Sequence, residues 1–276
     1  MPVISPSAFA SPAANDTAVP VAAALREKVR RLERAYSAQR AGQEAVPLGV
    51  PAIDALLPSG LLTGALHEIE AGPTPSGRVA AHDGAATGFA AHLLGRFGTL
   101  RPSGTLLWCR RPFGASDAPP YAAALAAWFD PARLLMVTVR RDEDLFWAME
   151  EGLRSGMAAV LGETRATDLV AGRRLSLAAE KSGVPALLLR GQPAPSQSVC
   201  TTRWRVASAA THSTPGLNDV GASRWRIELR RNRFGAPSVT ETPTWLLEWN
   251  DETHCLSVVP QAFHGSTRES DARLVG

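Results

Sequence analysis

The stretch that decides the fold is LHEIEAGPTPSGRVAAHDGAATGFAAHLLGRF, residues 66–97. The short run around Leu66 and Ile69 predicts a buried strand, and a segment rich in Gly and Pro follows it. Phe89, Leu93 and Phe97 then recur at intervals of four residues, which predicts a helix. A strand, a glycine-rich loop and a helix in this order are the setting of a phosphate-binding loop.

This loop keeps the glycine spacing of a phosphate-binding loop without its reactive side chains. Gly72 and Gly77 have the GxxxxG spacing, but Arg78 and Val79 stand where Lys would reach the phosphates and a hydroxyl would bind Mg²⁺. The helical pattern also becomes clear only near Thr87, well beyond the loop. We expect no ATP hydrolysis and no cofactor. Either these glycines only turn the chain above the sheet, or their backbone N–H groups bind an anion and retain ATP.

Other parts of a nucleotide site are also incomplete. A second glycine pair, Gly84 and Gly88, lies closer to the helix but has no lysine nearby. A strand predicted at 157–161 should end in Asp if it held the metal through water. Here the strand is followed by Gly162 and then by Glu163. Glu163 either substitutes for that Asp or caps the strand end in solvent. We therefore expect no catalytic residue and no metal site.

Outward from this stretch, strands and helices alternate along the chain. The segment 142–155 is typical, with Leu145, Met149 and Leu153 on one side of a helix and acidic residues such as Glu150 on a solvated face. Repeated βαβ units form a largely parallel sheet with helices on both faces. The predicted strands are 104–109, 134–139, 157–161 and 184–189, and the helices between them are 121–128, 142–155 and 168–181.

The final third of the chain changes character. Segments beginning at Trp204, Trp225 and Trp245 alternate apolar with polar residues, as half-buried antiparallel strands do. The predicted fold class is therefore α/β: a P-loop-type core with a mostly parallel sheet, helices on both faces and an antiparallel C-terminal extension.

Both termini look different from this core. Residues 1–20 are rich in Ala, Ser and Pro, and are predicted to be a disordered tail. Residues 21–41 carry an apolar stripe at helical spacing, which predicts an amphipathic helix that packs on its own core or on another chain. The α/β domain is expected over 46–260, followed by a disordered polar tail at 261–276.

Composition narrows the class of protein. A hydrophobic content of 45% in 276 residues is ample for a sizeable core. The first twenty residues lack the pattern of a signal peptide and no stretch is apolar enough to span a bilayer, so we expect a cytoplasmic protein without a membrane partner.

Three widely spaced cysteines indicate buried thiols instead of a disulfide or zinc framework. A net charge of +3 permits DNA contact without establishing it.

Several segments together resemble a known family. From Leu48 to Pro237 the order of elements is similar to the RecA recombinase core, and the whole chain resembles the ImuA family of RecA-related proteins in bacterial mutagenesis operons. The combination of an eroded phosphate loop with the later Trp- and Arg-rich segments carries the resemblance. The segments are LGVPAID at 48–54, LHEI at 66–69, TRWRV at 202–206 and RIELRRNR at 226–233.

The resemblance implies a RecA-like fold with a changed active site. The catalytic Glu of RecA would fall near Arg111, and a cation there cannot activate water. Gln192 would correspond to the nucleotide-sensing Gln, and Arg231 and Arg233 to the two Lys that approach a neighbouring subunit's ATP. Few residues follow Leu161 before the next helix, which leaves little room for a DNA-binding loop.

The resemblance also implies partners. ImuA-family proteins work beside ImuB, an inactive relative of Y-family polymerases, and beside the error-prone C-family DNA polymerase ImuC in translesion synthesis. RecA and DNA are further candidate partners. Arginines interleaved with tryptophans either contact a phosphate backbone or place Trp in the core and Arg in solvent. The candidate residues are Arg203, Trp204, Arg205, Trp225, Arg226, Arg230, Arg231 and Arg233.

We therefore predict a non-catalytic RecA-like accessory protein of error-prone translesion synthesis. One alternative is a divergent DNA-dependent ATPase in which Arg78 and Glu163 replace the usual groups. The other is a cell-division inhibitor, since SulA proteins are distant relatives with a similarly reduced core.

Overall fold

A computed structural model describes most of the predicted α/β domain. The described residues are Glu27 and the ranges 43–57, 60–73, 84–112, 118–166, 168–191, 198–211, 221–234 and 242–259. The chain divides into two units, Met1–Gln43 and Glu44–Gly276, and the sheet with its helices belongs to the second unit. The predicted tails at 1–20 and 261–276 lie outside the described residues, as does the helix at 21–41 apart from Glu27.

Nine strands form one sheet within the described part of the chain, in the order β11-β10-β9-β8-β3-β7-β6-β4-β5. The strands from β8 to β5 run parallel, with β3 in register between β7 and β8. This confirms the predicted parallel core. Its strands are β3 (Leu66–Ala71), β4 (Leu106–Arg110), β5 (Leu134–Thr138), β6 (Ala159–Thr164), β7 (Ala186–Arg190) and β8 (Thr202–Ala209).

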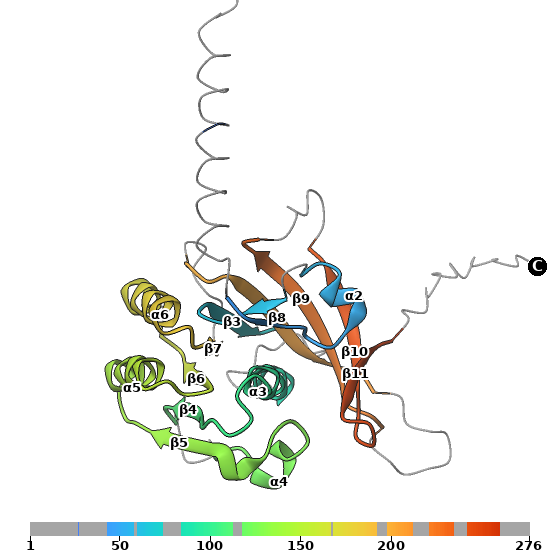
Figure 1. Cartoon of the computed structure of the whole chain (residues 1–276). Coiled ribbons are helices and arrows are strands. Elements are labelled where there is room, and N and C mark those ends of the chain that lie inside the picture. The colour runs from blue at the N-terminus through green and yellow to red at the C-terminus, as the bar shows by residue number, and fades with distance from the viewer. Residues whose placement is uncertain are drawn as a thin grey trace, which may run out of the picture. The chain divides into compact units, whose positions relative to one another are not determined.

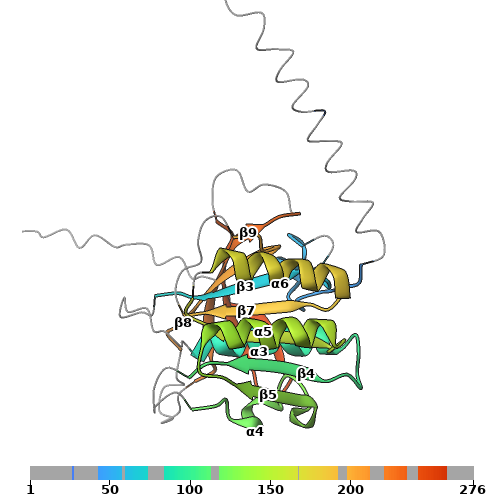
Figure 2. The ribbon, with the colours of Figure 1, turned by 90° about the vertical axis from the view of Figure 1, so that its left-hand side faces the viewer.

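Helices cover both faces of the parallel strands, as predicted. Figure 1 shows α3 (Gly84–Gly98) on one face and α5 (Asp142–Arg154) with α6 (Leu169–Ser182) on the other, and Figure 2 shows α5 and α6 from the front. The side chain of Asp168 caps α6 by accepting hydrogen bonds from the Val170 and Ala171 N–H groups. Helix α3 is present from Gly84, three residues before the predicted start near Thr87, because Gly and Ala carry no apolar signal.

The C-terminal strands extend the sheet. β9 (Arg224–Asn232), β10 (Thr244–Asn250) and β11 (Cys255–Val258) are antiparallel to their neighbours. The predicted antiparallel pairing of the first of these segments holds on one side only, since β8 is antiparallel to β9 but parallel to β3. Strand β11 was not predicted, because it has only four residues and gives too short a pattern.

Smaller elements complete the unit. Asp54 fixes the turn before the short helix α2 (Pro51–Asp54), where its carboxylate accepts hydrogen bonds from the N–H groups of Leu48 at 2.6 Å and Gly49 at 3.0 Å. The helix predicted at 121–128 is regular only over α4 (Ala122–Leu125). The remaining elements are β1 (Ala45–Val46), which pairs with β2 (Leu61–Leu62), and a 3₁₀ turn at Pro131–Arg133.

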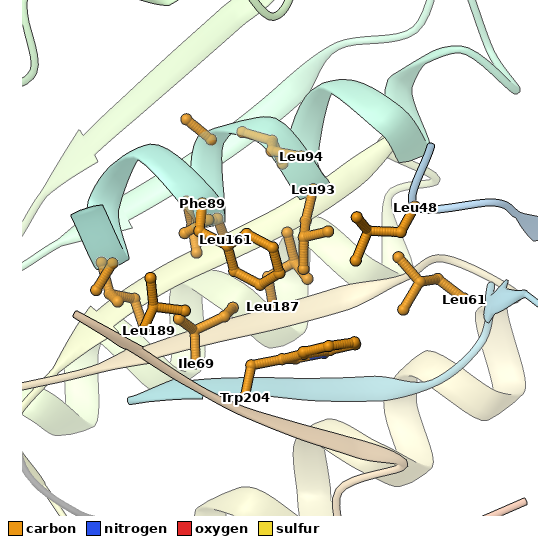
Figure 3. Packing of buried hydrophobic residues seen from close by; sticks show 14 of the residues in the cluster. Leu48, Leu61, Ile69, Phe89, Leu93, Leu94, Leu161, Leu187, Leu189 and Trp204 are labelled. Carbon is orange, nitrogen blue, oxygen red and sulfur yellow. The ribbon is translucent and has the colours of Figure 1, made fainter. Parts of the chain in front are cut away.

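The main core lies between the sheet and α3 (Figure 3). Phe89 and Leu93 of α3 face Ile69, Leu187 and other strand residues that are fully buried. The ring of Trp204 meets Phe89 edge-on at a centroid distance of 5.6 Å. A second core lies under α5 and α6. Apolar burial on both faces of β4, β6 and β7 explains why these strands begin with continuous apolar runs.

Two buried histidines make the stability of the fold depend on pH. His67 Nε2 donates to the Leu62 carbonyl at 2.9 Å while Nδ1 accepts from the Thr202 hydroxyl at 2.8 Å, and His92 Nε2 lies 3.0 Å from the Leu48 carbonyl oxygen. Burial lowers the pKa of both His67 and His92 from 6.5 to about 4. The folded state therefore holds both imidazoles neutral at pH values where the unfolded chain would protonate them.

We expect the free energy of unfolding to decrease by about 2 kcal/mol per histidine between pH 8 and pH 5. The unfolded chain takes up protons first, so stability is complete above about pH 6.5 and is lost as the pH falls toward about 4. Urea denaturation across this range measures the slope. His92→Gln, which keeps an amide donor near Leu48, should flatten it, and an unchanged slope in this variant would contradict the assignment.

Candidate functional site

The start of the predicted phosphate loop lies against the sheet. β3 ends at Ala71, and the Gly72 N–H donates a hydrogen bond of 2.7 Å to the Val206 carbonyl on β8. A Cβ at Gly72 would lie 3.0 Å from the Ala207 Cβ, so glycine permits this close approach. Gly77 and Arg78 lie outside the described residues, as does Gln192. Their predicted roles as phosphate-contacting and sensor residues therefore stay predictions.

Glu163, the candidate metal carboxylate, is held by the protein itself. It lies within β6 as a buried residue, with 4% of its surface exposed. Its Oε1 accepts a 2.6 Å hydrogen bond from the Trp108 indole, and Oε2 lies 3.7 Å from Arg110 Nε on β4. The expectation that Glu163 caps the strand end in solvent was wrong. Neighbouring side chains occupy both oxygens, so coordinating a metal would require breaking these contacts.

Arg111, which follows β4, is tied to the start of α5. Its Nη1 lies 3.3 Å from the Asp142 carboxylate, and its Nε donates to the Arg140 carbonyl at 3.0 Å. The position that the resemblance assigns to a catalytic Glu is thus occupied by a cation engaged in a structural contact.

A buried carboxylate at the centre of the sheet joins three parallel strands. Glu68 on β3 is fully buried, with Oε1 2.9 Å from Arg190 Nη2 on β7 and Oε2 3.1 Å from Arg203 Nε on β8. Burial alone would raise the pKa of Glu68, but Arg190, a hydrogen bond from Ser198 and Arg203 together hold its pKa below the ordinary value. Glu68 is therefore an ionised carboxylate within a structural network. Sequence reasoning missed it, although alternate polar residues in the LHEIE segment were a signal.

The network continues toward the C-terminal strands. Glu70 lies 3.5 Å from both Arg203 Nε and Arg205 Nη2, and Arg205 Nη1 lies 3.7 Å from Glu228 on β9. Arg230 Nη1 also approaches Glu228 at 3.5 Å. A register shift opposite Arg230 lets β9 pair Leu229 with Trp204 and Arg231 with Arg203. Much of the positive charge predicted for DNA contact is therefore neutralised within the sheet.

The remaining candidates divide between core and surface. Trp204 and Trp225 are buried, which confirms the alternative that placed them in the core. Arg203 contradicts the other half of that alternative, since it is buried as well. Arg226 and Arg233 are exposed. Arg231, partly buried, donates a 2.7 Å hydrogen bond to the Ser198 carbonyl, and the Arg233 guanidinium lies 5.8 Å from the Phe234 ring centroid.

Large apolar side chains are exposed on the outer surfaces of α5 and α6. Trp147 on α5 is 62% exposed, and Val170 and Leu177 on α6 are 63% and 65% exposed. We call these three residues the α5–α6 surface. Glu150, expected in solvent, is buried between the helices, with its carboxylate 2.8 Å from Arg174 of α6 and 3.2 Å from Arg154. This ion pair joins α5 to α6, which pack together on the second core.

The structure also tests the predictions for the cysteines, for metal ligands and for membrane-spanning helices. Cys109 and Cys200 are buried, and burial raises the pKa of these thiols to about 12 and 11. Cys255 is exposed, contrary to the prediction. Within the described ranges, no group of three or more His, Cys, Asp or Glu residues is placed to hold a metal ion. Among the helices of the same ranges, none has the length and apolarity needed to cross a membrane.

We expect Glu68→Gln to destabilise the fold by about 3–5 kcal/mol, because it removes the charge that the buried guanidiniums of Arg190 and Arg203 share and leaves Arg203 only its longer contact with Glu70. Glu151→Gln is the matched control, since it removes the carboxylate of an exposed pair with Arg154 and should cost less than about 1 kcal/mol. Urea denaturation at neutral pH measures both. Equal effects of the two substitutions would show that the buried network contributes little.

Comparison with known proteins places the chain among relatives. It matches no protein-family model. Protein ImuA from two strains of Caulobacter vibrioides is 33% identical over 219 residues, which cover 75% of this chain and 84% of the relative. The crystal structure of a KaiC-like protein from Pyrococcus horikoshii aligns with 79% of this chain and 100% of its own at 13% identity and a TM-score of 0.49. By its identity to the curated relatives, the chain belongs to the ImuA family.

Proposed function

We propose that this RecA-like chain is a non-catalytic accessory protein of error-prone translesion synthesis in the cytoplasm, acting through contacts with ImuB and the ImuC polymerase. The observation that carries the non-catalytic part is Glu163, the candidate metal carboxylate, whose oxygens face Trp108 and Arg110. Arg111 supports it, because the cation that replaces the catalytic Glu is engaged with Asp142. Membership of the ImuA family supports the setting in DNA-damage tolerance.

The α5–α6 surface supports a role in protein contact. An exposed Trp on α5 and two exposed aliphatic side chains on the neighbouring α6 have the composition of an interaction surface, because large apolar side chains gain most from leaving water. The helices that present it are fixed by the Glu150–Arg174 ion pair, so the surface needs little ordering on binding. We assign ImuB to this surface, with RecA and ImuC as alternative partners that the same binding assay distinguishes.

The non-catalytic role predicts no turnover of Mg-ATP by the purified protein, with or without single-stranded DNA. Phosphate release measures it, and an active RecA serves as the positive control. DNA-stimulated turnover that disappears in both Arg78→Ala and Glu163→Gln would overturn the proposal and favour the divergent ATPase. Arrest of cell division on overexpression would favour the inhibitor alternative.

Trp147→Ala should weaken binding to ImuB by about tenfold or more while leaving the unfolding midpoint unchanged, because the indole is largely exposed in the free protein. Biolayer interferometry with purified ImuB, and in parallel with RecA and ImuC, measures the affinity. Tyr121→Ala is the matched control, since Tyr121 is 76% exposed and precedes α4 on the other side of the sheet. Unchanged binding of all three partners to Trp147→Ala would refute the assignment.

A further inference from the structure

Strand β5 forms one edge of the nine-stranded sheet, next to β4 (Figure 2). Within the described residues, β4 is the only strand that pairs with it. The sequence of β5 is LLMVT, residues 134–138, which contains no charged residue and no proline. Such residues are the means by which edge strands commonly discourage pairing with another chain. This edge therefore lacks the usual protection against pairing.

The backbone of β5 shows which groups a further strand would bind. The Val139 N–H, one residue past the strand, donates to the Arg110 carbonyl of β4 at 3.0 Å. Because backbone groups alternate in direction along a strand, those of the odd-numbered residues face β4 and those of the even-numbered residues face away from it. The outward-facing residues are Leu134, whose N–H is already bonded within the preceding turn, Met136 and Thr138.

This pattern suits a second copy of the same strand running in the opposite direction. With Met136 on a two-fold axis, each Met136 N–H can donate to the Met136 carbonyl of the other copy. Each Thr138 N–H then meets the Leu134 carbonyl of the other copy, which is the one outward group of Leu134 that the turn leaves available. One strand thus supplies both the donors and the acceptors that the pairing needs.

The same register matches the apolar side chains. Val137 packs on the second core, and Leu135, two residues away, lies on the same face of the strand with 46% of its surface exposed. In an antiparallel pair centred on Met136, Leu135 of each copy lies opposite Val137 of the other. Apolar surface that the single chain leaves in water would therefore be covered in both copies.

The charges that flank β5 favour the antiparallel direction. Asp130 precedes the strand and Arg140 follows it, and both residues are exposed. Antiparallel pairing brings Asp130 of each copy toward Arg140 of the other. A parallel arrangement would instead place like charges beside each other at both ends of the strand, which is destabilising.

We propose that β5 pairs with β5 of a second copy of this chain, forming a two-fold antiparallel dimer in which the sheet continues across the axis. The second copy is the occupant because one strand carries both halves of the hydrogen-bonding pattern, the apolar pair and the opposite flanking charges. The dimer goes beyond the proposed accessory role, because the α5–α6 surface assigned to ImuB consists of other residues.

Cysteine cross-linking of the full chain tests the register. In a Cys255→Ser background, which removes an exposed thiol, Met136→Cys places two thiols directly opposite each other and should give a covalent dimer under a mild oxidant. Thr138→Cys is the matched control, since its exposed position lies opposite Leu134 and should leave a monomer on a denaturing gel. No covalent dimer with Met136→Cys, or equal yields from both variants, would overturn the register.

Sedimentation equilibrium between about 1 and 200 µM measures the association itself. Leu135→Lys should raise the dissociation constant of the dimer by at least about tenfold, because pairing would then bury a charge at the edge. Leu177→Lys places the same side chain on the α5–α6 surface and should leave the constant unchanged. Circular dichroism confirms that both variants are folded.

Three results would sink the β5 dimer, whatever the result of the ImuB assay. The first is a monomer at every concentration. The second is an assembly larger than a dimer, since an open series of copies requires a head-to-tail contact instead of a two-fold one. The third is a dissociation constant that Leu135→Lys changes no more than Leu177→Lys does.

Discussion

Glu68 lies on the central strand of the sheet, with its carboxylate between the guanidiniums of Arg190 and Arg203. These side chains come from β3, β7 and β8, so a single buried anion joins the strands at which the parallel core meets the C-terminal extension. Removing Glu68 would leave two buried guanidiniums short of counter-charge, whereas removing either arginine would leave Glu68 paired with the other one. The position of β8, and through it the antiparallel extension, depends on this constraint.

Ion pairs also hold the two residues that the sequence analysis placed at metal-binding or catalytic positions. Glu163 faces Trp108 and Arg110, and Arg111 faces Asp142. In each case the charged group is already engaged by a neighbouring side chain of the protein. Charged residues at the ends of the parallel strands thus serve cohesion of the sheet, which is the physical basis for proposing a binding role for this member of the ImuA family.

The two faces of the sheet offer different chemistry. α5 and α6 present an exposed indole and aliphatic side chains, which suit a protein partner. On the α3 side, buried indoles of Trp225 and Trp249 belong to the main core.

The sequence by itself determined the alternation of strands and helices, the parallel core and its covered faces, because apolar periodicity is a local property of the chain. It also indicated that the phosphate loop lacks its Lys and hydroxyl. Only the tertiary structure decided which charges meet: Glu68 with Arg190 and Arg203, or Glu163 with Arg110. It also decided that β8 runs parallel to β3 and that Trp225 lines a cavity. These facts depend on contacts between residues far apart in the chain, which no local pattern records.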